Sequence, residues 1–245
     1  MEISKIVIAG EGDLAKKIEE RLLQAGLTVT VSKTDFAKSE LVIETLSTDL
    51  AAKKLFLGTA DKNIPENTIV STTSSFNITE LASATKDPGK FVGLNFVFNS
   101  LQDELVVQII KCIETSDQTI DSCKKFVEKI SGTAIVIEDS PGLVLDRIMA
   151  MVINEAAIMY AAKLATIEDI DRVTKLCLNW AMGPFEFADT IGIDNVTATL
   201  DSLSKGGYQF TPCRLLKGMV AMGHLGKKSG KGFYTYNHGG DKHGN

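Results

Sequence analysis

A glycine-rich segment between an expected strand and an expected helix is the feature that most constrains this chain. Residues 10–15 read Gly-Glu-Gly-Asp-Leu-Ala and fit the pattern G-x-G-x-x-A. The β-branched and apolar residues 3–8 come before them, and apolar side chains at helical spacing follow. In this setting the glycines allow a tight turn, and the start of the helix offers free N–H groups to a pyrophosphate. The pattern therefore predicts a dinucleotide-binding loop with close backbone approach at Gly10, Gly12 and Ala15.

Three polar residues weigh against a bound dinucleotide. Glu11 and Asp13 place carboxylates at the start of the helix, where they would repel phosphates, and Asp13 is also suited to cap that helix. The acidic residue that holds ribose hydroxyls is expected at the end of the second strand, where this chain has Ser32. Asp35, three residues further on, is a candidate substitute. Two interpretations of the glycine segment are therefore open: a dinucleotide site or a purely structural turn.

Strand and helix patterns alternate over the first 140 residues. Short β-branched or apolar stretches indicate strands at 3–8, 27–31, 41–43, 68–70, 91–96, 105–110 and 133–137. Apolar residues at helical spacing indicate helices at 13–25, 49–57, 77–82 and 119–130. This alternation predicts an α/β fold, a Rossmann-type doubly wound parallel sheet with helices on both faces.

The pattern changes at the segment Ser140-Pro141-Gly142, after which it is almost entirely helical. Helices are expected at 143–163, 166–177, 185–191 and 211–222. The first of them is apolar on most sides, so it must be buried inside a helix bundle or against a second subunit. We therefore expect a nucleotide-binding domain at 1–140, an all-α C-terminal domain at 141–238 and a frayed tail at 239–245.

Composition and charge exclude several classes of protein. The 245 residues carry a net charge of −5 without a basic block, so nucleic acid is not expected as a partner. No run of about 18 apolar residues occurs, so no membrane span is expected, and the amino terminus lacks the pattern of a signal peptide. The four scattered cysteines form no metal-binding pattern, which predicts no metal site and reduced, mostly buried thiols in a cytoplasmic protein.

Four stretches of the chain resemble the 3-hydroxyacyl-CoA dehydrogenase family. They are residues 72–78 (TTSSFNI), 93–96 (GLNF), 182–189 (MGPFEFAD) and 226–234 (GKKSGKGFY). The family carries very similar strings in this order and at close to this spacing. The resemblance implies a nucleotide-binding domain followed by a helical domain that forms a homodimer. It also implies NAD-dependent oxidation of the 3-hydroxyl group of an acyl-CoA, a reaction of fatty acid metabolism.

The catalytic residues implied by this resemblance are mostly replaced. In the family a histidine takes the hydroxyl proton, a glutamate orients that histidine, and a serine and an asparagine hold the substrate oxygen. The position of the histidine is Asn95 in this chain, and the position of the glutamate is Gln108. The resemblance places Ser74 at the serine, which is retained, and Asp146 at the asparagine.

The cofactor and CoA sites implied by the resemblance are partly retained. Lys53 matches a family lysine near the nicotinamide ribose, and Asn99 corresponds to the asparagine of the histidine-containing string. The family inserts a long helical hairpin after the second strand, which helps to cover the CoA. Only Ser32 to Glu40 joins the second strand to the third here, and nine residues cannot form such a hairpin. Part of the expected site for an acyl-CoA is therefore absent.

The replaced pair decides the expected chemistry. Asn95 and Gln108 form hydrogen bonds, but neither takes a proton near neutral pH. Losing positioned acid–base assistance typically costs about 10²- to 10⁴-fold in rate. Asp146 would act as a substitute base if burial raised its pKa; otherwise it pairs with Arg147 or caps the long helix. We expect a family dehydrogenase whose turnover is weak or absent, and the alternative is a non-catalytic ligand-binding or scaffold homologue.

Overall fold

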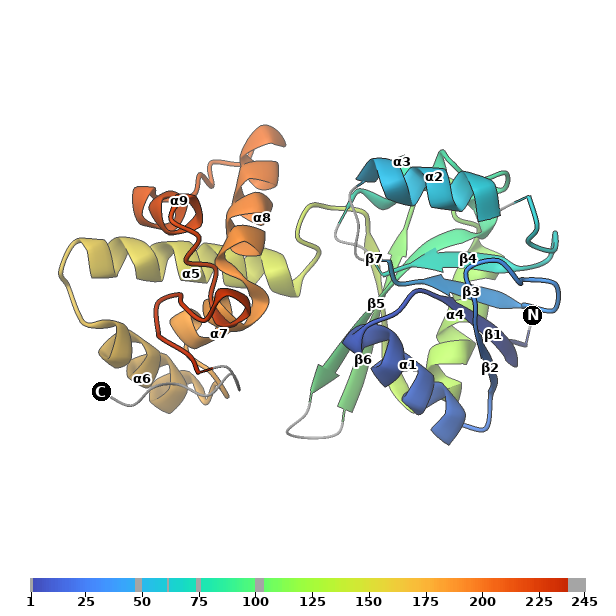
Figure 1. Cartoon of the computed structure of the whole chain (residues 1–245), viewed down its shortest axis with the longest axis horizontal. Coiled ribbons are helices and arrows are strands. Elements are labelled where there is room, and N and C mark those ends of the chain that lie inside the picture. Colours follow the sequence, from blue (N-terminus) through green and yellow to red (C-terminus); the bar gives the residue numbers. More distant parts are fainter. Residues whose placement is uncertain (1, 47–49, 61, 74–75, 100–103, 238–245) are drawn as a thin grey trace. The chain divides into compact units, whose positions relative to one another are not determined.

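The computed structural model describes residues 2–46, 50–60, 62–73, 76–99 and 104–237. The chain divides into two compact units, residues 1–140 (unit 1) and residues 141–245 (unit 2). Unit 1 is built on a β-sheet and unit 2 on helices (Figure 1). In the part of the chain that is described, no helix is long and apolar enough to cross a membrane. The expected tail at 239–245 lies outside the described residues.

Unit 1 is built on a seven-stranded sheet with the strand order β2-β1-β3-β4-β5-β6-β7. The strands are β1 (Lys5–Ala9), β2 (Thr28–Val31), β3 (Leu41–Glu44), β4 (Ile69–Thr72), β5 (Phe91–Asn99), β6 (Glu104–Lys111) and β7 (Gly132–Glu138). Strands β1 to β5 are mutually parallel, which confirms the predicted doubly wound sheet. β6 departs from this parallel arrangement, because it runs antiparallel to β5. Only four residues separate these two strands, too few for the crossover that parallel neighbours require.

Helices cover both faces of this sheet (Figure 1). α1 (Asp13–Gln24) and α4 (Asp117–Lys129) lie on one face, and α2 (Leu50–Ala60) and α3 (Ile78–Ala82) lie on the other. The larger core lies against α1 and α4, where Leu94 of β5 belongs to the same buried cluster as Phe126 of α4. Because successive strand residues point to opposite faces, Asn95 points to the face that α2 and α3 cover.

The connection from β2 to β3 passes over β1 without a helix. It comprises residues 32–40, whereas a parallel crossover ordinarily needs about a dozen residues or more. Phe36 in this connection is only 1% exposed and packs with Val7 and Val42, so it fills space that a crossover helix would otherwise cover. None of the four described residues of β2 is buried, and Val31 is 52% exposed. The short crossover therefore leaves the β2 edge of the sheet open to solvent.

Unit 2 confirms the predicted all-α domain. Its described helices are α5 (Leu145–Ala161), α6 (Ile167–Leu178), α7 (Pro184–Ile191), α8 (Ile193–Lys205) and α9 (Arg214–Ala221). The sequence pattern does not predict α8, because its threonines, serines and aspartates also favour turns and caps. Its core residues nevertheless recur every three or four positions, at Ile193, Val196, Leu200 and Leu203.

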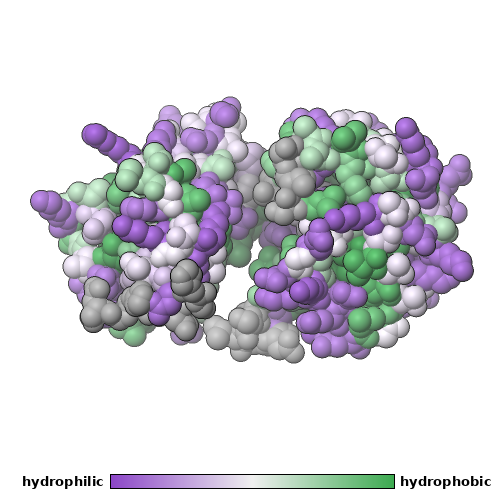
Figure 2. Space-filling view, viewed as in Figure 1, coloured by the Kyte–Doolittle hydropathy of each residue, from purple (hydrophilic) through white to green (hydrophobic). Residues whose placement is uncertain are grey.

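α5 buries one stripe rather than its whole circumference. The buried stripe consists of Met149, Ala150, Ile153, Ala156 and Ala157. Ile148, Ile158 and Tyr160 remain between 38% and 49% exposed. Apolar side chains also reach the surface of unit 2 over α9 (Figure 2). The helices of unit 2 therefore cover one side of α5 and leave other apolar side chains of this helix exposed.

Asp171 of α6 is buried and joins α6 to the start of α7. It is 1% exposed and accepts hydrogen bonds from the N–H groups of Phe185 at 2.8 Å and Glu186 at 3.1 Å. The hydroxyl of Tyr234 donates to the same carboxylate at 2.8 Å. Burial raises the pKa of Asp171, although these donors favour its charged form. A Cβ on Gly183 would lie 2.4 Å from Asp171, so a residue with a side chain does not fit there.

Asp189 of α7 anchors the segment that follows α9. Its carboxylate accepts hydrogen bonds from the N–H groups of Phe233 at 2.9 Å and Tyr234 at 2.8 Å, and from the Tyr236 hydroxyl at 2.9 Å. A Cβ on Gly232 would lie 1.9 Å from Asp189 Oδ1. The strings at 182–189 and 226–234 are therefore explained by close packing around two buried aspartates.

Replacing Asp189 with alanine should lower the free energy of unfolding of unit 2 by about 3 kcal/mol or more, because one buried and two partly buried donors lose their acceptor. Trp180, the only tryptophan, packs against the core of unit 2, so its fluorescence during urea unfolding measures this loss. Asp194→Ala is the matched control. It removes a partly exposed ion pair with Lys228 and should cost less than about 1 kcal/mol. Equal losses in the two variants would contradict the anchoring role of Asp189.

Candidate functional site

The glycine segment lies where β1 ends and α1 begins. Gly10 has no room for a side chain, because a Cβ there would lie 2.0 Å from Oγ1 of Thr45, the residue after β3. Gly12 has a φ of +99°, a conformation that favours glycine. Ala15 is buried in the core beneath the helix. The segment is a close turn between a strand and a helix, which is the setting that a phosphate-binding loop requires.

The start of α1 is available to an anion. Gly12 precedes the helix and has no side chain with which to cap it. Asp13 is the first residue of α1, so the interpretation of Asp13 as the capping residue is wrong. The first-turn N–H groups and the positive end of the helix dipole are therefore left for a ligand. The Asp13 carboxylate adds negative charge to this turn, which weakens its attraction for phosphate.

Glu11 is paired with a lysine from the end of β2. Its Oε1 lies 2.9 Å from Nζ of Lys33. The hydrogen bond and the positive charge of Lys33 hold the pKa of Glu11 below its ordinary value. The two side chains are 83% and 48% exposed, so solvent screens the pair and rearranging it costs little. The negative charge that Glu11 brings to the glycine segment is therefore balanced by Lys33.

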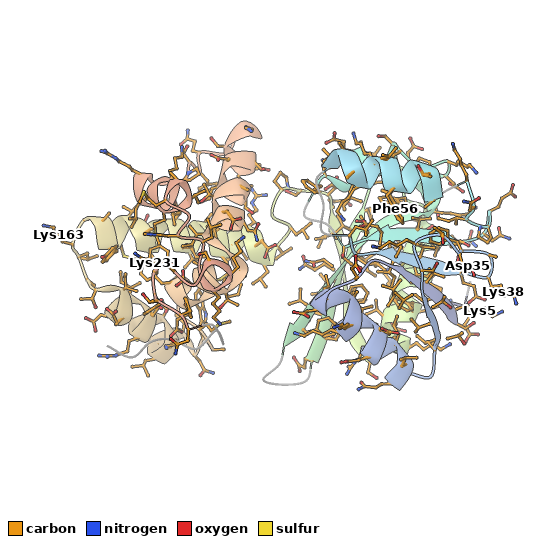
Figure 3. All side chains as sticks on the ribbon, viewed as in Figure 1. Lys5, Asp35, Lys38, Phe56, Lys163 and Lys231 are labelled. Atoms are coloured by element: carbon orange, nitrogen blue, oxygen red, sulfur yellow. The ribbon has the colours of Figure 1, made fainter. Side chains whose placement is uncertain are left out.

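Ser32 begins a tight turn after β2. Its Oγ accepts hydrogen bonds from the N–H groups of Thr34 at 3.2 Å and Asp35 at 2.9 Å. The Asp35 carboxylate accepts from the N–H of Ala37 and lines a cavity of about 290 Å³ with Lys5, the first residue of β1. Figure 3 shows Asp35 in the neighbourhood of Lys5. Asp35 therefore lies beside residues of β1, and its role as a substitute ribose ligand stays a prediction.

Glu44, the last residue of β3, is fully buried and paired with Lys53 of α2. The Lys53 Nζ lies 2.8 Å from each carboxylate oxygen. The Thr72 hydroxyl donates to Oε2 at 2.6 Å, and the N–H of Leu46 donates to Oε1. The sequence predicts Lys53 as a cofactor contact, whereas the structure places its ammonium group against Glu44 with the side chain 4% exposed. Sequence reasoning missed Glu44, whose signal is an acidic residue that ends the apolar strand 41–44.

Asn95 and Gln108 lie directly opposite each other in the β5–β6 ladder. Opposed residues of an antiparallel pair have Cβ atoms about 5 Å apart, so the two carboxamides are neighbours. A Cβ on Gly93, two residues before Asn95, would touch Ile78 of α3, which confirms the face on which this pair lies. Gln108 is 4% exposed, and its Oε1 has no hydrogen-bond partner among the described residues. The structure thus brings together two of the predicted site residues and leaves a buried acceptor between the strands and helix α3.

The remaining predicted residues are not all described. Ser74 lies outside the described residues, and Asn99 ends β5 with a side chain that is not described. Asp146 lies in the first turn of α5, where burial raises its pKa. The guanidinium of the neighbouring Arg147 lies 4.1 Å from the ring centre of Tyr208. The pairing of Asp146 with Arg147 stays a prediction.

The thiols and possible metal ligands are dispersed. Cys112 and Cys123 are buried, Cys213 is half-buried and Cys177 is exposed, and all four are free. Burial raises the pKa of Cys123 to about 12, so its thiol stays protonated. Within the described ranges, no cluster of three or more His, Cys, Asp or Glu side chains could hold a metal ion.

The fold and the glycine segment define a class of protein. A strand–glycine turn–helix unit opens a doubly wound sheet, and a separate helical unit follows, as in two-domain proteins that bind a dinucleotide. Residues 7–140 match the NAD binding domain of 3-hydroxyacyl-CoA dehydrogenase, and residues 142–236 match its C-terminal domain. The chain belongs to the 3-hydroxyacyl-CoA dehydrogenase family. The resemblance carried by the four sequence strings is thereby confirmed.

The likeness to individual relatives extends over nearly the whole chain. A "probable 3-hydroxybutyryl-CoA dehydrogenase" of Bacillus subtilis is 35% identical over 234 residues, which cover 94% of this chain and 81% of the relative. The 3-hydroxybutyryl-CoA dehydrogenase of Clostridioides difficile is 36% identical, over 96% of this chain and 83% of that protein. The crystal structure of (S)-3-hydroxybutyryl-CoA dehydrogenase from Ralstonia eutropha aligns with a TM-score of 0.89 at 26% identity, over 96% of this chain and 100% of the other.

Replacing Lys53 with methionine should lower the free energy of unfolding of unit 1 by about 3–5 kcal/mol, because Glu44 then stays buried without its cation. The neighbouring Lys54→Met is the matched control. It removes a partly exposed pair with Glu80 and should cost less than about 1 kcal/mol. Hydrogen–deuterium exchange at the amides of β3, measured over a urea series, separates the two variants.

A double variant checks the cause of that loss. Lys53→Met combined with Glu44→Gln removes both charges, so it should recover part of the stability that the single Lys53 variant loses. A double variant that is less stable than either single variant would show that the loss does not come from an uncompensated carboxylate.

Proposed function

We propose that this chain is a 3-hydroxyacyl-CoA dehydrogenase homologue that binds NAD but turns over hydroxyacyl-CoA weakly or not at all. The observation that carries this proposal is the cross-strand pair Asn95–Gln108. These residues occupy the positions where the family resemblance implies a proton-accepting histidine and its glutamate. Both are carboxamides, so the pair keeps hydrogen-bonding groups in place without a group that takes a proton near neutral pH.

The glycine segment fits the pyrophosphate of the cofactor. Gly10 and Gly12 let a ligand approach the backbone, α1 begins without a side-chain cap, and Lys33 balances the charge of Glu11. When bound, the nicotinamide supplies the hydride acceptor or donor. We assign Lys53 an indirect part, because its ammonium group holds Glu44 and so the turn that packs on Gly10.

The carboxamide pair is suited to hold a ligand oxygen. The buried Oε1 of Gln108 accepts no hydrogen bond from the described residues, and an unsatisfied buried acceptor costs free energy. A ligand hydroxyl group would satisfy it by donating, and the side-chain N–H of Asn95 can donate to a ligand carbonyl oxygen. The proposed ligand is therefore an acyl-CoA-like molecule with an oxygen at this point, bound without removal of its proton.

The proposed catalytic positions are Asn95, Gln108, Ser74 and Asp146. Of these four side chains, that of Asp146 is the ionisable one. Its raised pKa makes it a stronger base than an ordinary aspartate once it is deprotonated. If Asp146 accepts the proton, residual activity rises with pH through that raised pKa and is lost in Asp146→Asn. If the carboxamide pair alone holds the substrate, Asp146→Asn leaves the residual rate unchanged.

We also propose a homodimer formed through unit 2. Ile148, Ile158 and Tyr160 of α5 are exposed in the single chain, and a second copy would remove their apolar surface from water. The proposed compartment is the cytoplasm, because all four cysteines are free thiols. The second candidate function is a scaffold without a bound cofactor, which the carboxylates of Glu11 and Asp13 in the glycine segment favour.

A steady-state assay with acetoacetyl-CoA and NADH, run beside a fluorescence titration with NADH, tests the proposed function. We expect NADH to bind and turnover to stay at least about 10²-fold below the ordinary enzyme range of about 1–10³ s⁻¹. Turnover within that range would refute the loss of catalysis. An absence of binding of both NADH and NADPH would select the scaffold function instead.

Restoring an acid–base pair should restore activity. Asn95→His combined with Gln108→Glu should raise the rate by about 10²-fold or more, because a histidine held by a carboxylate can take the hydroxyl proton. The control is Val97→His with Val106→Glu, which places the same pair one position along on the same face and should give no gain. Equal gains in both double variants would contradict the assignment of the site to Asn95 and Gln108.

A further inference from the structure

We propose that the carboxyl end of β2 selects the 2′-phosphorylated dinucleotide NADP(H) over NAD(H), with Ser32 and Lys33 as the specificity-determining residues. This inference rests on the proposed function, because it concerns the adenosine ribose of the same bound dinucleotide. It follows from where these two side chains lie and from the hydrogen bonds that they can still form.

Ser32 lies at the strand end that contacts the adenosine ribose in this type of fold. It directly follows β2, and its N–H donates to the carbonyl oxygen of Ile8 in β1 at 3.1 Å. β1 leads within two residues into Gly10, so Ser32 and the glycine segment lie at the carboxyl ends of neighbouring parallel strands. In Rossmann-type folds, the residue at this strand end contacts the 2′ position of the ribose.

The hydrogen-bonding capacity of Ser32 suits a phosphate. A carboxylate at this strand end would accept hydrogen bonds from ribose hydroxyls and repel a 2′-phosphate. The Ser32 oxygen already accepts from the N–H groups of Thr34 and Asp35, so its own proton is left to donate. The Asp35 carboxylate is occupied by the N–H of Ala37, near the amino end of β1. This strand end therefore offers a ribose substituent a hydroxyl donor.

Lys33 supplies a positive charge at the same place. Its Nζ reaches Glu11 at 2.9 Å, so it spans from the end of β2 to the glycine segment. Lys33 is about half exposed and Glu11 is 83% exposed, so packing holds neither side chain in this pair. A ribose phosphate carries about 1.5 to 2 negative charges at neutral pH and three strong acceptor oxygens. It can therefore draw the ammonium group away from a single exposed carboxylate.

Glu11 opposes the interaction between Lys33 and the ribose phosphate. A substitution that removes its charge should therefore raise the affinity for NADPH, whereas Lys33→Ala lowers it. The pKa of Glu11 is held below the ordinary value by Lys33, so it is a carboxylate at neutral pH. It competes for the lysine and repels a nearby phosphate. Glu11→Gln removes the competing charge and keeps a side chain of similar size.

The test is a titration of the full chain with NADPH and with NADH, followed by nicotinamide fluorescence. The wild-type chain should bind NADPH about tenfold more tightly than NADH, or better. Lys33→Ala should weaken NADPH binding about tenfold more than it weakens NADH binding, because NADH loses only the balance of the Glu11 charge. Ser32→Asp should reverse the preference, and Glu11→Gln should increase it.

Lys38→Ala is the matched control, because this lysine lies in the same crossover but lines the cavity near Lys5 (Figure 3). It should leave both affinities unchanged, and circular dichroism confirms that each variant is folded. NADH binding as tight as NADPH binding would overturn the inference and leave the proposed function standing. Equal losses for both dinucleotides in Lys33→Ala would also overturn it. A chain that binds neither dinucleotide would overturn both this inference and the proposed function.

Discussion

The geometry of the candidate site depends on a carboxylate that has been removed from water. Glu44 accepts hydrogen bonds from the side chains of Lys53 and Thr72, so it ties together the end of β3, helix α2 and the end of β4. A buried ion pair is costly unless its polar atoms are satisfied, and here both carboxylate oxygens have donors. The next residue, Thr45, packs so closely on Gly10 that no side chain fits at that position of the glycine segment. The buried pair of Glu44 and Lys53 thus supports the glycine segment from behind, without being a ligand of the phosphate itself.

Local patterns predicted the parts of the fold that depend on neighbouring residues. The alternation of strands and helices, the glycine turn and the change of character after Ser140 are all readable within short windows of sequence. Partners that are distant in the chain could not be predicted in this way. Nothing near Glu44 indicates that a lysine nine residues later and a threonine 28 residues later converge on it. The same holds for Asp189, whose donors lie 44 to 47 residues away.

The residues of the candidate site and the strings that identify the family also differ in what could be predicted from them. The resemblance to the family singled out Asn95 and Gln108, and strand register explains why they meet: both belong to one antiparallel pair. The strings that identify the family most specifically carry a different kind of information. Those at 182–189 and 226–234 surround Asp171 and Asp189 and fix the packing of unit 2. The two most specific strings therefore consist of residues that build the fold, whereas Asn95 and Gln108 keep their places in the strand pair although neither takes a proton near neutral pH.

The crossover from β2 to β3 has a consequence for the energetics of ligand recognition. β2 is an edge strand that contributes no buried residue to the core, and its hydrogen bonds run to β1 alone. Such a strand can open as a subglobal unit while the rest of the sheet stays intact. A ligand held at Ser32 would restrict that opening, so part of its intrinsic binding energy is spent on ordering the strand. The apparent affinity at this end of the sheet is therefore coupled to the local stability of the strand as well as to contacts with the ligand.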